Sequence, residues 1–261
     1  MRNRLLSLVS CLPIVIAACT HQGGRSSIAA VSEPSSLEAE RNFIRDLVRT
    51  TVSVSVALRS DGVPRSYRGA GIVLDWSGNI LTNDHVLIGP DAYTPTAGSP
   101  AALAIVSFCD LGKDDRPVCG IGTRATVIRR DSFPHGGADL ALLRLCDGLT
   151  PPPTARPAKF AERAPTSGEA LWRIGRDPAP IAMGYYLESV FGLKEFRVGF
   201  PVASGASGGP VFNASGEVVG INRAHEPERH WRLPVARVIQ SSYIKEWLKT
   251  ALPVSRPCGA R

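Results

Sequence analysis

Three residues of the 261-residue sequence have types and an order that suit nucleophilic catalysis. Ser207 lies among glycines in the segment GASGGPVF (205–212). His85, in the segment ILTNDHVL (80–87), lies at the end of an expected apolar strand, and Asp139 directly precedes the segment LALLRL. A serine hydroxyl is a poor nucleophile near neutral pH until a base removes its proton, and histidine, with an ordinary pKa of about 6.5, can act as that base. A buried aspartate fixes the imidazole tautomer and stabilises the imidazolium form. We therefore predict Ser207 as nucleophile, His85 as base and then acid, and Asp139 as the group that orients His85.

The pattern Gly205-x-Ser207-x-Gly209 also matches the nucleophile elbow of α/β-hydrolases. In that fold the chain order is Ser, then Asp or Glu, then His, and a helix follows the serine. No aspartate follows Ser207 in this sequence, and residues 210–224 have the pattern of strand, turn and strand. This alternative is therefore disfavoured.

The elements that must position these residues are mostly short strands. Val52, Val54 and Val56 alternate with small polar residues, as in a half-buried strand. A strand, a turn at 75–78 and a second strand follow within 69–86, and residues 210–224 are typical of a hairpin with its tip at 213–216. Further strands are expected at 103–108, 123–129, 140–145, 170–174, 187–191 and 194–199. Helical spacing is confined to 36–49 and to 235–252, so the pattern predicts an all-β barrel or sandwich with a C-terminal helix.

Together the three motifs resemble the trypsin-like (chymotrypsin-fold) serine endopeptidases, and among them the bacterial HtrA-like and glutamyl-endopeptidase branches. The resemblance covers roughly Thr51 to Ala224. It implies two six-stranded antiparallel β-barrels, with His85 and Asp139 in the first barrel and Ser207 in the second. It also implies an oxyanion hole made by the backbone N–H groups of Gly205 and Ser207, polypeptide substrates, and no cofactor.

The sequence departs from that family pattern in ways that bear on activation and specificity. Ala206 replaces the aspartate that pairs with a newly cut N-terminus in digestive members, so that mode of activation is not expected. About 37 residues follow Ala224, too few for the PDZ domain of HtrA-like proteins. Asp84 beside His85 is unusual, and we expect it to point to solvent.

The walls of the specificity pocket are expected at four positions: Pro201, Asn222, Arg223 and His225. Pro201 occupies the place of the aspartate that selects Lys or Arg, so basic side chains are disfavoured. Glutamyl endopeptidases have a histidine at the position of Asn222, although Arg223 or His225 could still attract an acidic side chain. We expect a small or medium apolar side chain in the pocket.

The N-terminal segment has the features of an export signal. Arg2 and Arg4 precede an apolar run, and the residues IAAC (16–19) resemble the lipobox of bacterial lipoproteins. We expect a signal peptide at 1–18, lipid on Cys19, a flexible tether at 19–36, a domain at 37–250 and a tail at 251–261. An ordinary secretory leader is the alternative. The lipobox interpretation predicts an exported protein, held at a membrane by its lipid, with the domain on the periplasmic or extracellular side.

The remaining four cysteines predict two disulfides, since an even number in an exported chain suggests pairing. Cys109 and Cys119 flank a polar loop whose ends can meet, which leaves Cys146 to pair with Cys258. A zinc site is disfavoured, because no Cys-x-x-Cys pair or histidine cluster is present. We expect no metal.

The formal net charge of +7 comes from scattered basic residues rather than from a stripe, so nucleic-acid binding is not indicated. The sequence does not specify an oligomeric state. Two functions remain: an exported serine endopeptidase that works through an acyl-enzyme, or a catalytically silent trypsin-like module that binds other envelope proteins.

Overall fold

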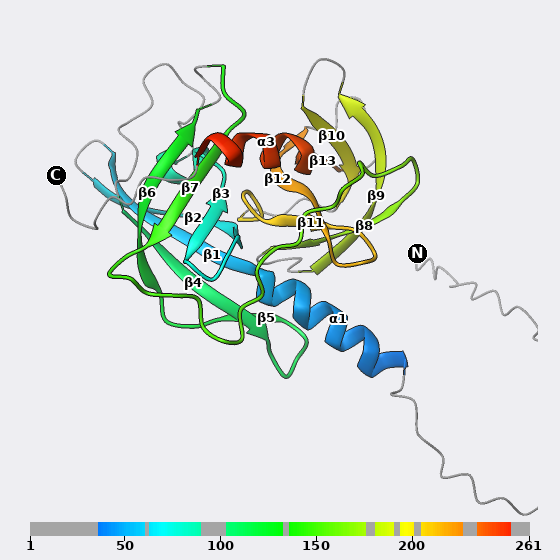
Figure 1. Ribbon diagram of the computed structural model, residues 1–261, viewed down its shortest axis with the longest axis horizontal. Coiled ribbons are helices and arrows are strands. Elements are labelled where there is room, and N and C mark those ends of the chain that lie inside the picture. The colour runs from blue at the N-terminus through cyan, green and yellow to red at the C-terminus, as the bar shows by residue number, and fades with distance from the viewer. Residues whose placement is uncertain are drawn as a thin grey trace, which may run out of the picture. The chain divides into compact units, whose positions relative to one another are not determined.

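The computed structural model of the chain describes residues 36–60, 63–89, 103–132, 136–175, 181–190, 194–200, 205–226 and 234–251 (Figure 1). The predicted signal peptide, lipid-bearing Cys19, most of the predicted tether and most of the predicted C-terminal tail lie outside these residues. The described chain is folded mainly as antiparallel strands, with helices near its two ends.

The first barrel contains six strands and is closed by the pairing of β4 with β1. Their order around the barrel is β1-β2-β3-β7-β6-β4. These strands are β1 (Thr51–Ser60), β2 (Val63–Val73), β3 (Asn79–Thr82), β4 (Leu103–Leu111), β6 (Thr123–Asp131) and β7 (Leu140–Leu145). A short strand, β5 (Pro117–Cys119), pairs with β4 outside the barrel.

The second barrel is also closed and has the order β10-β13-β12-β11-β8-β9. These strands are β8 (Ala170–Ile174), β9 (Ile181–Val190), β10 (Glu195–Gly199), β11 (Pro210–Phe212), β12 (Val218–Glu226) and β13 (Val235–Gln240). The prediction of an all-β fold with two six-stranded antiparallel barrels is confirmed. Figure 1 shows the two barrels with the C-terminal helix α3 (Ser241–Ala251) above them.

Alternating side chains fill the barrels, as the sequence pattern indicates. On β1, Val52, Val54 and Val56 are buried while the serines between them are not. Two clusters of buried side chains correspond to the barrel interiors. A third cluster joins Leu47 of helix α1 (Ser36–Thr50) to apolar residues of both barrels, including Leu140 of β7 and Phe212 of β11. This third cluster packs the two barrels against each other, which fixes the geometry of any site formed between them.

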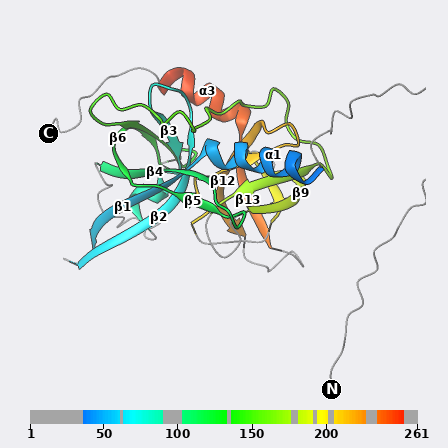
Figure 2. The ribbon, with the colours of Figure 1, turned by 90° about the horizontal axis from the view of Figure 1, so that it is seen from below.

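Helix α1 (Ser36–Thr50) is attached to both barrels (Figure 2). Phe43 contacts Trp172 of the second barrel edge to face, with ring centroids 5.7 Å apart. Arg49, in the last turn, donates two hydrogen bonds of 3.0 Å to the carboxylate of Asp110 on β4. The chain therefore enters the domain along a helix that bridges the two barrels.

The C-terminal helix begins later than predicted. Residues 235–240, expected to be its first turns, form β13 instead. Val235, Val238 and Ile239 are apolar at spacings that fit a helix, but they are β-branched residues, and β13 is needed to connect β10 with β12. The strand predicted at 187–191 is part of the longer β9, and the short elements β5 and α2 (His85–Ile88) were not predicted.

One of the two predicted disulfides joins described residues. Cys109 on β4 and Cys119 on β5 lie opposite each other and are bonded, as predicted. Cys146 is buried and takes part in a disulfide, while its predicted partner Cys258 lies outside the described residues.

Within the described residues, no helix is long and apolar enough to cross a membrane. The same residues contain no group of three or more His, Cys, Asp or Glu side chains that could hold a metal ion.

The attachment of α1 through Asp110 makes a pH-dependent prediction. The hydrogen bonds from Arg49 lower the pKa of Asp110, although burial opposes this. Such a carboxylate stabilises the fold above its unfolded pKa of about 3.9, and this contribution is lost as pH falls through the lower folded value. Because the pair is partly exposed and screened, Asp110→Asn should reduce the free energy of unfolding by only about 0.5–1 kcal/mol at pH 7. Urea denaturation should show the difference disappearing in acid.

Asp114→Asn, at an exposed aspartate between β4 and β5, is the matched control and should have little effect at either pH. An equal loss of stability for Asp110→Asn at neutral and acidic pH would contradict the assigned ion pair.

Candidate functional site

Asp139 is held by its backbone at the start of β7. Its φ of 66° lies in the left-handed region, which aspartate tolerates better than most residues do. Its N–H donates to the carbonyl of Asp131 at 2.7 Å, and its own carbonyl accepts from Asn83 Nδ2 at 2.8 Å and from the N–H of Asp84 at 3.3 Å. The side chain is 1% exposed. Asp139 is therefore a buried carboxylate in a fixed orientation.

His85 lies at the first position of α2, directly after β3, and contacts Asp139 twice. Its backbone N–H donates to Asp139 Oδ1 at 2.9 Å, and its ring Nδ1 lies 2.7 Å from Asp139 Oδ2. An ionised carboxylate can only accept, so Nδ1 carries the proton and Nε2 is left as the basic nitrogen. The imidazole remains partly exposed, at 17%, and so can be reached from solvent.

Ser207 lies on a loop of the second barrel that is bonded to both barrels. Its carbonyl accepts a hydrogen bond from the N–H of Ala70 on β2 at 2.8 Å. The N–H of Gly208 donates to the carbonyl of Asn222 on β12, also at 2.8 Å. The Ser207 hydroxyl donates to the carbonyl of Arg223 at 3.2 Å.

The backbone before Ser207 suits the predicted oxyanion hole. Gly205 has a φ of 84°, a conformation that glycine adopts without strain. Within the described part of the chain, neither the N–H of Gly205 nor that of Ser207 donates a hydrogen bond. Both donors remain available to an oxygen atom of a ligand.

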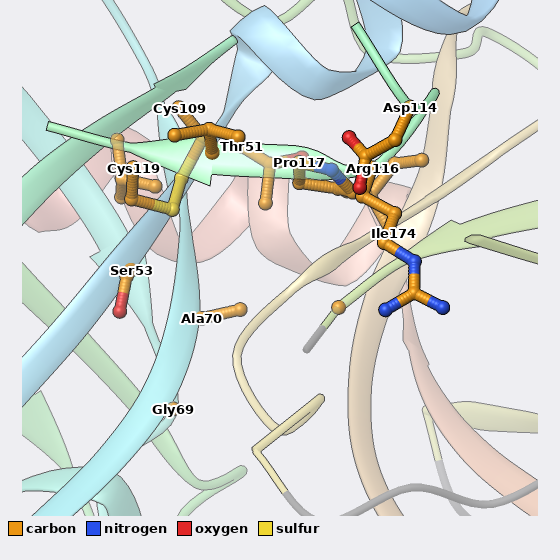
Figure 3. Close-up of a pocket in the computed structure, with 13 residues that line it drawn as sticks. Thr51, Ser53, Gly69, Ala70, Cys109, Asp114, Arg116, Pro117, Cys119 and Ile174 are labelled. Carbon is orange, nitrogen blue, oxygen red and sulfur yellow. A yellow bond between two sulfur atoms is a disulfide. The ribbon is translucent and has the colours of Figure 1, made fainter. Parts of the chain in front are cut away.

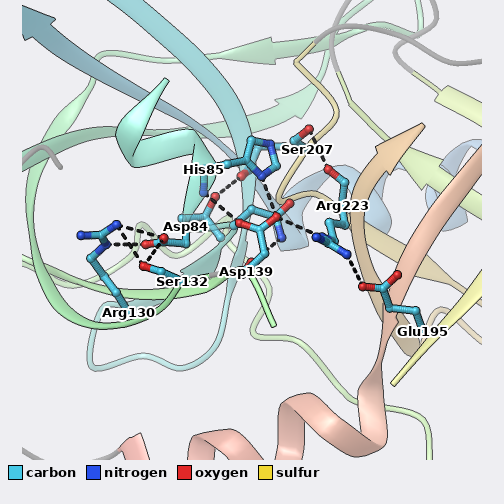
Figure 4. A network of polar contacts seen from close by, with 11 residues as sticks. Asp84, His85, Arg130, Ser132, Asp139, Glu195, Ser207 and Arg223 are labelled. Atoms are coloured by element: carbon cyan, nitrogen blue, oxygen red, sulfur yellow. Dashed lines mark hydrogen bonds and ion pairs between the residues drawn. The ribbon is translucent and has the colours of Figure 1, made fainter. Parts of the chain in front are cut away.

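The structure brings the three predicted residues together (Figure 4). In this view the imidazole of His85 lies between the carboxylate of Asp139 and Ser207. Hydrogen bonds link Asp139 and Ser207 through Arg223, which contacts Asp139 with its side chain and Ser207 with its carbonyl. His85 and Asp139 come from the first barrel and Ser207 from the second, as the sequence predicted.

The contacts of Arg223 differ from those expected of a pocket residue that attracts an acidic side chain. Its side chain is 3% exposed and, among described residues, its guanidinium contacts two carboxylates: Nε donates to Asp139 Oδ2 at 3.3 Å, and Nη1 donates to Glu195 Oε1. Glu195 on β10 also accepts from Arg237 Nε on β13 at 2.7 Å. The predicted role of Arg223, attracting an acidic substrate side chain, therefore lacks support, because its charge is directed at Asp139 and Glu195.

Asp84 is not turned to solvent, contrary to our expectation. It is 1% exposed, and its carboxylate accepts from Arg130 Nε, from Arg130 Nη2 at 2.9 Å and from Ser132 Oγ at 2.6 Å. A buried carboxylate requires such compensation, because leaving a charge unpaired in the interior is strongly unfavourable. The ion pair fixes the backbone on which His85 begins α2.

The turn before Asp139 is also held from the C-terminal helix. Tyr243 of α3 donates to Asp131 Oδ2 at 3.0 Å, and the N–H of Ala138 donates to the same oxygen at 3.1 Å. Burial, with Asp131 as a second cause, raises the pKa of Tyr243, so its hydroxyl stays a donor over a wide pH range. Asp131 thus links the second barrel's last helix to the loop that positions Asp139.

A cavity of about 300 Å³ is lined by residues of β1, β2, β5 and β8, among others (Figure 3). Its wall includes Gly69 and Ala70 of β2, and Gly175, which follows β8. These residues adjoin the Ser207 loop, because Ala70 bonds to Ser207 and a Cβ placed on Gly175 would lie 3.1 Å from the Cβ of Ala206. Arg116 and the Cys109–Cys119 disulfide close its other side.

Of the remaining predicted pocket residues, Asn222 has a described side chain. Asn222 is buried, and its N–H donates to the carbonyl of Gly209 at 2.8 Å, so its backbone braces the Ser207 loop. Pro201 and the side chain of His225 lie outside the described part of the chain.

Comparison with known proteins agrees with this geometry. The trypsin-like peptidase domain matches residues 69–221, which include His85, Asp139 and Ser207. The chain is also similar in structure to the serine endoprotease from Yersinia pestis, with a TM-score of 0.56 and 20% sequence identity. That similarity covers 81% of this chain and 66% of the Yersinia chain. No curated protein sequence matches significantly.

The close packing at Gly208 makes a prediction about the loop. Gly208 has a φ of 85°, and a Cβ there would lie 2.2 Å from the Ala70 carbonyl oxygen and 2.3 Å from Thr82 Oγ1. Gly208→Ala combines left-handed strain with overpacking and should lower the free energy of unfolding by about 3–5 kcal/mol. Chemical denaturation measures this loss.

Gly216→Ala is the matched control, because Gly216 has a φ of 72° but its nearest neighbour would be 3.5 Å away. It should lose only the backbone strain, about 1–2 kcal/mol. Equal losses for the two variants would mean that the loop does not pack as closely against β2 and β3 as described.

Proposed function

The chain belongs to the family of trypsin-like serine peptidases, enzymes that hydrolyse peptide bonds, and on this premise we propose that Ser207, His85 and Asp139 perform the hydrolysis. The observation that carries the proposal is the 2.7 Å contact between His85 Nδ1 and a buried Asp139 carboxylate. This contact leaves Nε2 of His85 as a base on the side of Ser207 (Figure 4).

In the proposed mechanism, Ser207 Oγ attacks the carbonyl carbon of the scissile peptide bond while His85 Nε2 takes the hydroxyl proton. The tetrahedral intermediate collapses to an acyl-enzyme, and the imidazolium gives the proton to the leaving amine. A water molecule then attacks the ester carbonyl carbon while His85 takes one of its protons. The bond from that carbon to Ser207 Oγ breaks, His85 returns the proton to Oγ, and the carboxylic acid product leaves. Asp139 stays ionised throughout and stabilises the imidazolium.

The free N–H groups of Gly205 and Ser207 support the same mechanism. Negative charge develops on the substrate oxygen as the carbonyl is attacked, and preorganised donors stabilise it. Loss of one such donor typically lowers the rate roughly 10²- to 10³-fold. A silent binding module has no need of these features, so their presence together favours an active enzyme over the alternative.

In the described geometry the Ser207 hydroxyl donates to the Arg223 carbonyl. Attack therefore requires rotation about the Cα–Cβ bond of Ser207 that turns its proton toward His85. Such a rotation, of about 120° between staggered positions, is fast compared with bond cleavage. Binding of a substrate carbonyl at the oxyanion donors would favour the rotated form.

We further propose that the substrate residue before the cleaved bond is small or medium and apolar. Two features support this: Pro201 offers no charge for a basic side chain, and the charge of Arg223 is directed at Asp139 and Glu195. The cavity lined in part by β2 and β8 offers a polypeptide additional surface next to Ser207.

The proposed setting is the bacterial cell envelope, with the protein exported and anchored through lipid on Cys19. The basic, then apolar, then small-residue pattern of the first 19 residues supports this proposal. Helix α1, which bridges the barrels, would follow the tether from the membrane.

A fluorophosphonate probe tests the proposed nucleophile. The intact protein should be labelled and Ser207→Ala should not be labelled. His85→Ala should reduce the rate of peptide cleavage by roughly 10⁴-fold or more, because the base is lost, while the thermal midpoint changes little. If neither the intact protein nor Ser207→Ala is labelled, the catalytically silent binding module is favoured.

Fractionation of bacterial cells tests the proposed anchor. The intact chain should sediment with membranes, whereas Cys19→Ser should be released into the soluble exported fraction, since the lipid is lost. Cys11→Ser, a change within the signal peptide, is the control and should leave the protein in the membrane fraction. Retention of Cys19→Ser in membranes would rule out this anchor.

A further inference from the structure

A row of alternating charges starts at Asp139 and continues into the second barrel. Arg223 contacts Asp139, and Glu195 contacts Arg223 (Figure 4). Arg237 contacts Glu195 in turn. Asp139, Arg223 and Glu195 are each less than 10% exposed, and Arg237, at 22%, is the member nearest to solvent. These contacts are a salt bridge between the two barrels that ends on the carboxylate proposed for catalysis.

The two oxygens of Asp139 are held differently. Oδ1 accepts the backbone N–H of His85, so its place is fixed by the first barrel. Oδ2 accepts both His85 Nδ1 at 2.7 Å and Arg223 Nε at 3.3 Å. Rotation of the carboxylate away from His85 would break the bond to Arg223 as well. The guanidinium therefore restricts the carboxylate to the orientation that holds the imidazole.

Glu195 keeps this arrangement compatible with catalysis. A cation beside Asp139 weakens the attraction of the carboxylate for an imidazolium, because the opposite charges partly cancel. Glu195 accepts a hydrogen bond from Nη1 of the same guanidinium, and Arg237 donates to the other oxygen of Glu195. Asp139 thus has a fixed hydrogen-bond donor and keeps most of its electrostatic attraction for the imidazolium of His85.

We propose that Arg223 is a positioning residue for the hydrolytic reaction: it orients Asp139, and Glu195 holds it and balances its charge. The proposal rests on the proposed function of His85, Asp139 and Ser207. Arg223 acts through Asp139 and does not touch the reacting atoms with its side chain. Its role is realised in the chemical step rather than in substrate binding.

The test needs a variant that does not leave a buried charge alone, because Arg223→Met by itself would strand Glu195. The double variant Arg223→Met/Glu195→Gln removes both charges, and the glutamine can still accept from Arg237. With a chromogenic peptide substrate, its kcat should fall about 10- to 100-fold, as expected for a misplaced catalytic group, with KM within about twofold of the intact protein. The thermal midpoint confirms that the variant is folded.

The matched control is Arg197→Met/Glu188→Gln, which removes an ion pair of 2.7 Å between β10 and β9 of the same barrel. Its kcat should stay unchanged. The same pair of changes at Arg223 and Glu195 is also made in an Asp139→Asn background. There it should lower kcat no further, because the carboxylate that Arg223 orients is already gone.

Three results would overturn the proposal: an unchanged kcat in the folded double variant, a rise in KM alone, or the same loss in the Asp139→Asn background. If the double variant does not fold, Arg223→Lys replaces it. This variant keeps the charge opposite Glu195 but lacks the fork that bonds two carboxylates, so kcat should fall and KM should not. Wild-type kcat in Arg223→Lys would equally overturn the proposal.

These experiments distinguish failure of the role proposed for Arg223 from failure of the proposed function. Cleavage by the intact protein that is absent in Ser207→Ala supports the triad whatever Arg223 does. An inactive intact protein refutes the triad, whereas an active protein with an unaffected double variant refutes only the role of Arg223.

Discussion

A buried carboxylate needs compensating donors, and that requirement organises the site. Asp139 is 1% exposed and accepts from the backbone and the ring of His85 and from Arg223. Without these donors its charge would be strongly unfavourable in the interior. Since the donors come from both barrels, Asp139 also joins the barrels at the candidate site. The backbone N–H of His85 and Arg223 remain as donors when the ring is removed, so the fold depends on the whole set of donors and the proposed chemistry on the ring contact.

The charges around this carboxylate are balanced in pairs. Three carboxylates face three guanidinium groups, and the six residues are Asp84, Asp139, Glu195, Arg130, Arg223 and Arg237. Each barrel contributes acidic and basic members. Among the described residues, these six charges sum to zero, and Asp139 is the carboxylate that contacts the imidazole of His85. Breaking one pair would expose His85 to the charge left behind.

Much of the fold and of the candidate site could be predicted from the sequence. The alternation of Val52, Val54 and Val56 identified β1, and the order of His85, Asp139 and Ser207 identified the residues that meet. What could not be predicted depends on contacts between distant segments. Arg223 and Glu195 are 28 residues apart, and no local pattern pairs them. Residues 235–240 have apolar spacing that fits a helix, yet the closing of the barrel makes them a strand.

The central claim is that Asp139 holds His85 against a nucleophilic Ser207 in a site with two ready oxyanion donors. A crystal structure of the protein after reaction with a fluorophosphonate tests it most directly. The account predicts phosphorus on Ser207 Oγ, a phosphonyl oxygen accepting from the N–H groups of Gly205 and Ser207, and His85 Nδ1 still bonded to Asp139. Phosphorus on another residue, or His85 turned away from Asp139 in the adduct, would contradict it.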